Sequence, residues 1–181
     1  KTIELDHDKY AIYERITFLL KSKFALTHFA LYEVNHAHKE RKLIYITQEN
    51  SFCAKKADSG ALECRAYRTA TDIISTDFPQ LCSSCTQNGK IEYVCLPFTI
   101  NNDYSLILSI SSKSKDRLGD ISNKIISIKN FLEAAKPVIE SKILMDILRD
   151  SSLRDGLTGL YNRRFLEEYI EQEQAQMQRD T

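Results

Sequence analysis

The stretch from residue 117 to residue 152 constrains the fold most, because it repeats apolar residues at helical spacing over its whole length. These apolar positions are Ile121, Ile125, Ile128, Leu132, Ala135, Ile139, Ile143 and Ile147. Their steps alternate between three and four residues and end in consecutive steps of four, which is typical of a heptad seam with a stutter. We therefore predict a long helix whose second half pairs with its twin in a parallel homodimer. The alternative is a last helix that packs on its own sheet.

One proline interrupts this pattern. Pro137 has no amide proton and crowds the preceding turn, so we expect it to bend or divide the helix near residues 133 to 136. The expected result is a domain helix followed by a separate output helix, whose geometry can carry a signal to whatever follows.

The first part of the chain predicts one helix and two hairpins. Residues 8 to 25 place apolar side chains at helical spacing. Residues 27 to 34 and 43 to 47 are rich in β-branched and aromatic residues and predict a hairpin. Residues 91 to 98 and 104 to 110 have the same character, and a turn-forming Asn-Asn-Asp cluster joins them. They predict the second hairpin.

Between the hairpins, residues 48 to 90 are irregular, with a short helix expected near residues 61 to 67. The order of helix, hairpin, irregular insertion, hairpin and long helix predicts an α+β fold, an antiparallel sheet flanked by helices with a long C-terminal signalling helix. Over residues 8 to about 130 this order resembles a GAF domain, a small ligand- and redox-sensing fold. A PAS-like domain is the alternative, although it more often places its helices between the second and third strands.

Charge and hydropathy exclude several classes of partner. The 25 basic residues balance 25 acidic ones, which leaves no basic field for nucleic acid. No apolar run reaches the roughly 20 residues that span a bilayer, and the first six residues are too polar for a signal peptide core. We expect a cytoplasmic module without a membrane segment of its own.

The run Asp155-Gly156-Leu157-Thr158-Gly159-Leu160-Tyr161-Asn162-Arg163-Arg164 resembles the signature that opens GGDEF domains, the catalytic modules of diguanylate cyclases. The resemblance implies that a full-length parent makes cyclic di-GMP from GTP with Mg²⁺. It also implies that the catalytic residues lie downstream of position 181, so this chain itself is not expected to be an enzyme. Gly156 and Gly159 would let the chain turn sharply, and Asn162 can cap the next helix.

These patterns divide the chain into three regions. Residues 1 to 130 are the GAF-like sensory domain, residues 131 to 154 are the signalling coiled-coil helix, and residues 155 to 181 are the start of a GGDEF domain.

The cysteines cluster in the irregular segment. Four of them are the predicted metal ligands Cys53, Cys64, Cys82 and Cys85, a complement that suits tetrahedral zinc or an iron–sulfur cluster. Cys95 alternates with apolar residues in a predicted strand and is read as a small buried hydrophobe.

The residues that follow each cysteine disfavour two other cysteine chemistries. Covalent haem needs a histidine where Thr86 stands, and a bilin usually needs one where Arg65 and Ser83 stand, so both are disfavoured. A redox dithiol remains open, because Cys-x-x-Cys is also a thiol–disulfide spacing and Arg65 or Arg68 could lower a neighbouring thiol pKa. A permanent disulfide is not expected in a reducing cytoplasm.

Three further residues, Arg65, Tyr67 and Arg68, could bind an anionic ligand, or they could form an ordinary exposed helix face. His36 and His38 are read as exposed turn residues. The predicted function is the sensory input domain of a diguanylate cyclase, acting through a cysteine-rich metal, iron–sulfur or redox site. Its alternatives are a metal-free small-molecule-binding GAF domain and a dimerisation or spacer module with a structural zinc.

Overall fold

The computed structural model describes residues 7–47, 53, 60–77, 82, 91–112, 115–167, 169–170 and 174, without the side chains of residues 7–9 and 115–120. The chain divides into two compact units, one of Tyr13–Pro137 and one of Lys1–Ile12 with Val138–Thr181. The elements are α1 (His7–Ser22), β1 (Phe29–Asn35), β2 (Glu40–Ile46), the 3-10 helix η2 (Ala61–Glu63), α2 (Arg65–Thr69), β3 (Ile73–Ile74), β4 (Glu92–Thr99), β5 (Tyr104–Ser112) and α3 (Lys115–Leu153).

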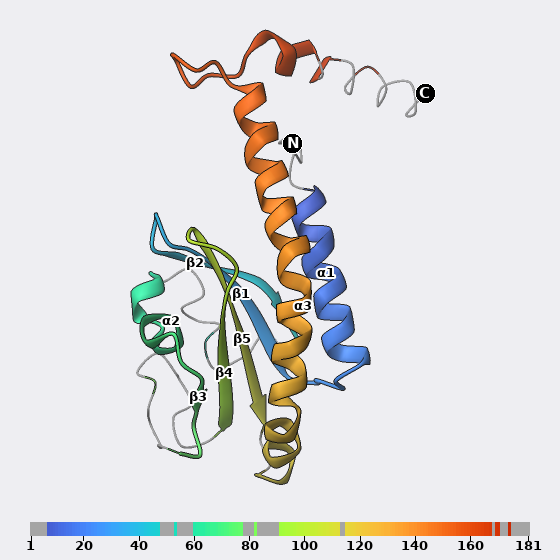
Figure 1. Cartoon of the computed structure of the whole chain (residues 1–181), viewed down its shortest axis with the longest axis vertical. Helices are drawn as coiled ribbons and strands as arrows, with labels where there is room; N and C mark the ends of the chain where they lie inside the picture. Colours follow the sequence, from blue (N-terminus) through green and yellow to red (C-terminus); the bar gives the residue numbers. More distant parts are fainter. Residues whose placement is uncertain are drawn as a thin grey trace. The chain divides into compact units, whose positions relative to one another are not determined.

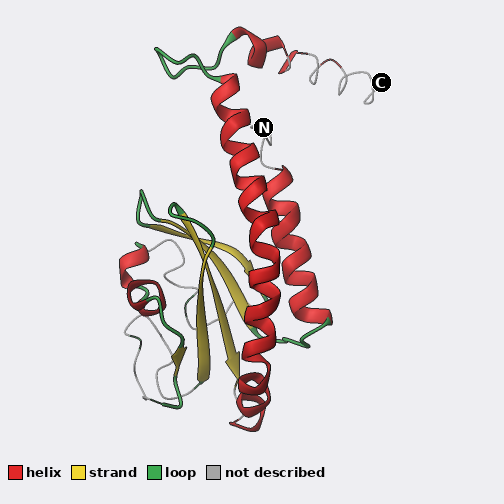
Figure 2. Cartoon of the chain, in the orientation of Figure 1, coloured by secondary structure: helices red, strands yellow, loops and turns green. Residues whose placement is uncertain are grey.

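A five-stranded sheet of order β2-β1-β5-β4-β3 forms the centre of the larger unit (Figure 2). Every neighbouring pair is antiparallel. The two hairpins predicted from the sequence are β1–β2 and β4–β5, and they join through β1 and β5, with Tyr32 opposite Ile107. The predicted α+β fold with an antiparallel sheet is therefore confirmed.

Local chemistry explains the β4–β5 turn. The Asn101 side-chain oxygen accepts hydrogen bonds from the backbone N–H groups of Asp103 and Tyr104, both at 2.9 Å. This is the side-chain turn that asparagine favours, because its short amide replaces a backbone carbonyl.

Helices α1 and α3 lie along one face of the sheet, and α2 lies on the other (Figure 1). On the first face, Phe24 packs against Phe131 of α3 with ring centroids 5.6 Å apart. The Tyr13 hydroxyl of α1 donates a hydrogen bond to the buried Glu33 carboxylate of β1. Because both faces are covered, the first six residues of β1 are buried without alternation.

The second face carries a smaller layer. We call residues 60 to 77, which hold η2, α2 and β3, the covering segment. Its Ala61, Ala66 and Ile73 are buried against Tyr32 of β1 and Ile107 of β5 in one apolar cluster. The cluster places the covering segment directly over the centre of the sheet.

Pro137 does not divide the long helix. A single α-helix runs through it from Lys115 to Leu153, so the predicted separation into two helices is wrong. Pro137 is exposed. A proline on the solvent side removes one backbone hydrogen bond, and the bonds of the adjacent turns keep the helix continuous.

The predicted dimer seam is also corrected. Five of its residues are buried within this chain: Ile125, Ile128, Leu132, Ile139 and Ile143. A different set of apolar residues is exposed on the part of α3 that follows Pro137, namely Val138, Leu144, Met145, Ile147 and Leu148. Of the residues in the predicted seam, only Ile147 is also in this exposed set, because most of the other seam residues pack inside the chain.

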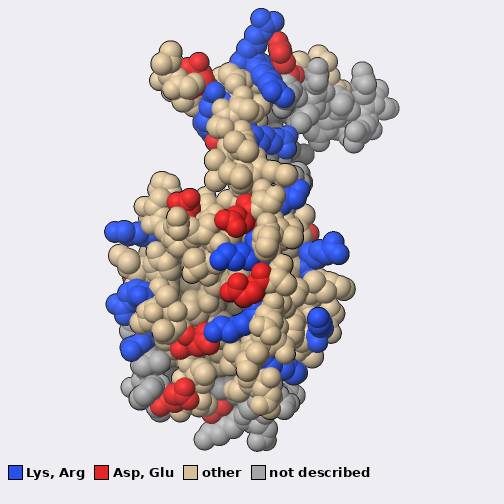
Figure 3. Space-filling view, viewed as in Figure 1, with Lys and Arg blue, Asp and Glu red and all other residues tan. Residues whose placement is uncertain are grey.

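Figure 3 shows basic and acidic side chains mixed over the face in view, with no large patch of one sign. Among the described residues, no helix combines the length and the apolar character that crossing a membrane requires.

Candidate functional site

A group of buried thiols lies beneath the covering segment. Cys53, Cys64, Cys82 and Cys95 are each between 5% and 7% exposed and belong to the same buried cluster as Tyr32. Each of these four residues carries a reduced thiol that is not part of a disulfide. The structure therefore brings together three of the four predicted ligands. The fourth, Cys85, lies outside the described residues.

Arg41 of β2 adds a charge to this cluster. Its side chain is only 2% exposed, and its guanidinium carbon lies 4.9 Å from the centre of the Tyr32 ring. It also hydrogen-bonds to Cys64. Burial acts to lower the pKa of Arg41, but the neighbouring Cys53 and Cys64 thiols and Tyr32 outweigh it and hold that pKa above its usual value. The site therefore keeps a permanent positive charge beside its sulfurs.

The Cys53 and Cys82 thiols are in hydrogen-bond contact. A hydrogen bond to Cys82, then burial, then the proximity of Cys95 raise the pKa of the Cys53 thiol far above its ordinary value, and Arg41 opposes the shift only in part. The backbone N–H of Cys82 donates to the Tyr93 hydroxyl of β4 at 3.2 Å. In the metal-free chain, the Cys53 thiol is thus held protonated.

Cys64 stands at the junction of η2 and α2. Its extended backbone (φ −81°, ψ 116°) ends η2, and its carbonyl accepts the Arg68 N–H at 3.1 Å to begin α2. The same residue thus starts a helix with its backbone and meets Arg41 with its side chain. Cys64 therefore belongs both to the cysteine cluster and to the covering segment.

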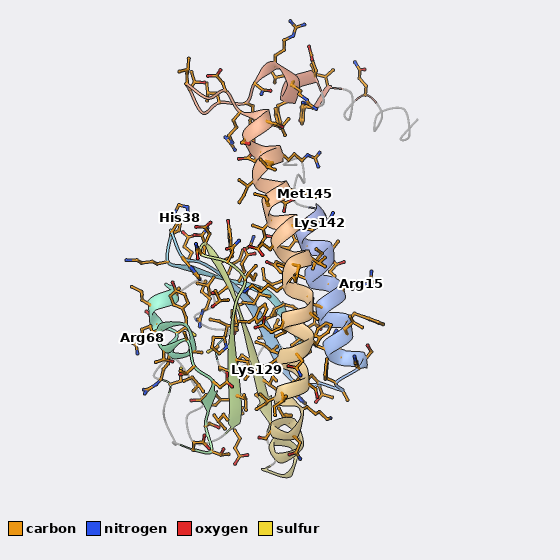
Figure 4. All side chains as sticks on the ribbon, in the orientation of Figure 1. Arg15, His38, Arg68, Lys129, Lys142 and Met145 are labelled. Carbon is orange, nitrogen blue, oxygen red and sulfur yellow. The ribbon has the colours of Figure 1, made fainter. Side chains whose placement is uncertain are left out.

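The three predicted ligand-binding residues of α2 point in different directions. Arg68 is exposed and projects from the outer side of α2 (Figure 4). Tyr67 is half-buried and packs against the cysteine cluster. Arg65 is half-buried. The structure thus brings Tyr67 to the cluster and leaves Arg68 outside it.

His36 is more enclosed than an ordinary turn residue. Its Nδ1 lies 2.7 Å from the Asn102 carbonyl oxygen, and its Nε2 lies 2.8 Å from Ser105 Oγ. A carbonyl can only accept, so Nδ1 carries the proton. The ring also packs against Tyr67, with centroids 5.6 Å apart. His36 therefore holds the two hairpin turns and α2 together, while His38 is exposed.

The described residues do not by themselves form a metal centre. Within that part of the chain, no three histidine, cysteine or acidic side chains converge so as to hold a metal ion. Cys53 and Cys82 are in contact, whereas Cys64 is engaged with Arg41. A four-cysteine centre therefore depends on Cys85.

Two residues of this cluster escaped the sequence reasoning. Arg41 lies between the two strands predicted for the first hairpin, and arginine is seldom buried, so the sequence does not indicate that its side chain points into the core. Cys95 was read as a small hydrophobe, yet its Sγ lies 3.3 Å from Ser109 Oγ and it is close enough to Cys53 to raise that thiol's pKa. Strand alternation could have found Cys95, since it shares a face with Tyr93.

Residues 155 to 164 form an ordered turn in the smaller unit. The Asp155 carboxylate accepts hydrogen bonds from the Thr158 N–H and hydroxyl and from the Leu157 N–H, and these lower its pKa. Gly159 takes φ +69°, which glycine adopts without strain. The predicted cap is confirmed, because Asn162 Oδ1 accepts the Phe165 N–H at 3.1 Å.

Arg154, the residue before this turn, ties it to α3. It contacts the Asp150 carboxylate at 3.0 Å, the Gly159 carbonyl at 3.1 Å and the Tyr161 hydroxyl at 3.3 Å. Its guanidinium also lies 4.5 Å from the centre of the Tyr161 ring. The end of α3 and the start of the next helix are therefore joined by side chains as well as by backbone.

No protein-family model and no curated protein matches this sequence. Two solved structures share its fold. The GAF domain/HD domain protein from Geobacter sulfurreducens has a TM-score of 0.54 and 12% identity, covering 80% of this chain and 99% of that chain. Residues 122 to 287 of a methyl-accepting chemotaxis protein have a TM-score of 0.52 and 8% identity, covering 80% of this chain and 94% of that one. At these identities the likeness shows a GAF-like fold.

Proposed function

We propose that this chain is the sensory input domain of a diguanylate cyclase and that its buried thiols receive the signal. The observation that carries this proposal is the contact between the Cys53 and Cys82 thiols inside the cluster that contains Arg41 and Cys64. A core built only for stability needs neither a buried guanidinium nor thiols in contact, because apolar side chains fill the same volume at lower cost.

The first chemistry that fits is a redox dithiol. A low-molecular-weight disulfide would oxidise Cys53 and Cys82, so that one sulfur–sulfur bond forms between them, the reagent's bond breaks, and two reagent thiols leave with the two protons. The Cys53 pKa is raised, so at neutral pH little thiolate is present and oxidation is expected to be slow.

The second chemistry is the predicted zinc or iron–sulfur site on Cys53, Cys64, Cys82 and Cys85. The Arg41 cation supports it, because a metal bound by several thiolates carries excess negative charge that a buried cation offsets. The metal would keep the thiols deprotonated at neutral pH.

Metal analysis and an absorption spectrum of anaerobically purified chain separate these chemistries. Metal-free protein that forms a Cys53–Cys82 disulfide in a glutathione redox titration supports the dithiol, and peptide mass mapping identifies the pair. Stoichiometric zinc, or absorbance near about 400 nm from sulfur-to-iron charge transfer, supports the metal site. Metal-free protein with neither cysteine in any disulfide overturns both and leaves a metal-free small-molecule receptor.

The output half of the proposal rests on the resemblance of residues 155 to 164 and on the continuity of α3. The helix ends at Leu153, and the turn that follows is ordered and capped. The test is cyclic di-GMP synthesis by a protein in which this chain precedes a complete GGDEF domain. Activity that differs between the oxidised and reduced protein, and that loses this difference in Cys53→Ser, supports the proposal. Identical activity in both states rejects the sensory role, and a structural zinc without any response would indicate a spacer module.

The partner that we propose is a second copy, bound through the exposed face of α3 formed by Val138, Leu144, Met145, Ile147 and Leu148. Ile139 and Ile143 in this part of α3 are buried inside the chain, so the five exposed residues form a second apolar group on the same helix. Exposed apolar groups of this kind are typical of protein–protein contact surfaces. Sedimentation should show a dimer for the chain and a monomer for Leu148→Glu. A monomeric parent chain would contradict this surface.

A further inference from the structure

One ion pair connects the covering segment to the signalling helix. Asp72 Oδ2, between α2 and β3, lies 2.8 Å from Lys129 Nζ on α3. The two residues are 57 positions apart in sequence and belong to the same compact unit. Lys129 is labelled on α3 in Figure 4. The pair thus links the layer over the cysteines to the helix on the opposite face.

The sheet topology allows this contact. β3 is the edge strand of the sheet, and it is only two residues long, with Ile73 opposite Cys95 and Ile74 opposite Val94. Asp72 directly precedes this strand, at the border between the two faces. An acidic side chain here can reach around the edge of the sheet to α3, which lies on the opposite face from α2 (Figure 1).

A short path leads from the thiols to Asp72. Cys64, which hydrogen-bonds to Arg41, begins α2, and this helix has only five residues. α2 ends at Ala70 in a left-handed conformation (φ 50°), and Asp72 follows two residues later. A helix of barely more than one turn cannot absorb much displacement, so movement at Cys64 is passed on to Asp72.

We propose that the Asp72–Lys129 ion pair transmits a change at the cysteine cluster to α3. This proposal rests on the sensory function proposed above and names the link by which that site is read. The Lys129 and Asp72 side chains are 45% and 29% exposed, so the pair contributes modestly and is expected to shift an equilibrium by at most about fivefold. An ion pair of this strength can shift an equilibrium between conformations of α3 and is too weak to determine the fold.

Hydrogen exchange on the full 181-residue chain tests this link without knowledge of the signal. In the parent sequence, Cys64→Ser perturbs the cluster and should change the exchange rates of α3 amides in residues 121 to 136 by about two- to fivefold. In an Asp72→Asn background, the same Cys64→Ser change should alter those rates by less than about 1.5-fold. The exchanged charges of the Asp72→Lys, Lys129→Asp double variant should restore the larger effect.

Lys124→Met is the matched control, since Lys124 also lies on α3 but contacts the Phe24 carbonyl at 3.4 Å instead of Asp72. In a Lys124→Met background, Cys64→Ser should change the exchange rates of the α3 amides as much as it does in the parent sequence. Circular dichroism checks that each variant is folded, and Cys64→Ala replaces Cys64→Ser if the serine variant is not. An effect of equal size with and without Asp72, or no effect on α3 in the parent sequence, overturns the proposal. The exchange measurements on these variants use no oxidant and no metal. A negative result here therefore leaves the redox and metal tests of the proposed function unaffected, and a negative result there leaves this test unaffected.

Discussion

Raising the pH should destabilise the metal-free chain through Cys53. The Cys82 hydrogen bond, and then burial, hold the Cys53 thiol protonated in the folded state well above its ordinary pKa. In the unfolded chain the same thiol ionises at about pH 8.5 to 9. Because the folded state retains a proton that the unfolded state has released, stability is complete below that range and is lost as the pH rises above it.

The magnitude follows from proton linkage. If the folded thiol stays protonated up to pH 10, the free energy of unfolding falls by about 1.4 to 2 kcal/mol between pH 7 and pH 10. With a urea dependence of about 2 kcal/mol/M, the unfolding midpoint moves down by about 0.7 to 1 M.

Urea titrations in chelator and reductant, at pH 7 and pH 10, measure this loss. Cys53→Ala removes the titrating group. Between pH 7 and pH 10, its free energy of unfolding should therefore fall by about 1.4 to 2 kcal/mol less than that of the parent. Ile73→Val is the control, because it removes one methyl group from the same cluster and should retain the parent's pH dependence. Equal losses in the parent and in Cys53→Ala would refute the reasoning.

Three further changes probe other parts of the chain. Leu132→Ala, at a 1% exposed position, should cost about 2 to 5 kcal/mol in urea unfolding, whereas Leu148→Ala, at a 59% exposed position, should cost the monomer less than about 0.5 kcal/mol; equal costs would contradict the assignment of faces on α3. Asn162→Ala should remove about 1 kcal/mol of helix stability, seen as faster hydrogen exchange in residues 163 to 167, and unchanged exchange would argue against the cap. Thr158→Val should raise the pKa of Asp155 part of the way toward its usual value, because it removes the hydrogen bond from the Thr158 hydroxyl and keeps the larger contribution from the Thr158 backbone N–H; an NMR titration that shows no change would count against this turn.

The sequence was sufficient for the two hairpins and the long helices because their patterns repeat. The strands from residue 91 to residue 110 combine β-branched and aromatic residues with an Asn-Asn-Asp turn, and each of these features acts locally. Pro137 misled the prediction, because its effect depends on which side of the helix meets solvent. That side is a tertiary property that local spacing does not contain.

The candidate site was predictable only in part. Cysteine clustering identified Cys53, Cys64 and Cys82, because thiols are rare and their grouping is visible in the sequence. Arg41 and the strand Ile73–Ile74 were not predictable, since a buried arginine contradicts the usual distribution and two residues carry no periodicity. The contact of Cys53 with Cys82 joins residues that are far apart in sequence, so local spacing does not predict it.

The pairing of β1 with β5 also sets when the chain can fold. Tyr32 and Ile107 face each other across this pair, so the centre of the sheet closes only after both hairpins exist. Contacts between such distant segments are slow to form, because a long loop must be closed before they add stability. During synthesis, Cys53, Cys64 and Cys82 therefore emerge before the strand that completes their burial. These thiols are exposed to solvent, metals and oxidants while the chain is being made. Oxidation or metal binding at that stage can therefore set the redox state or metal content of the folded domain.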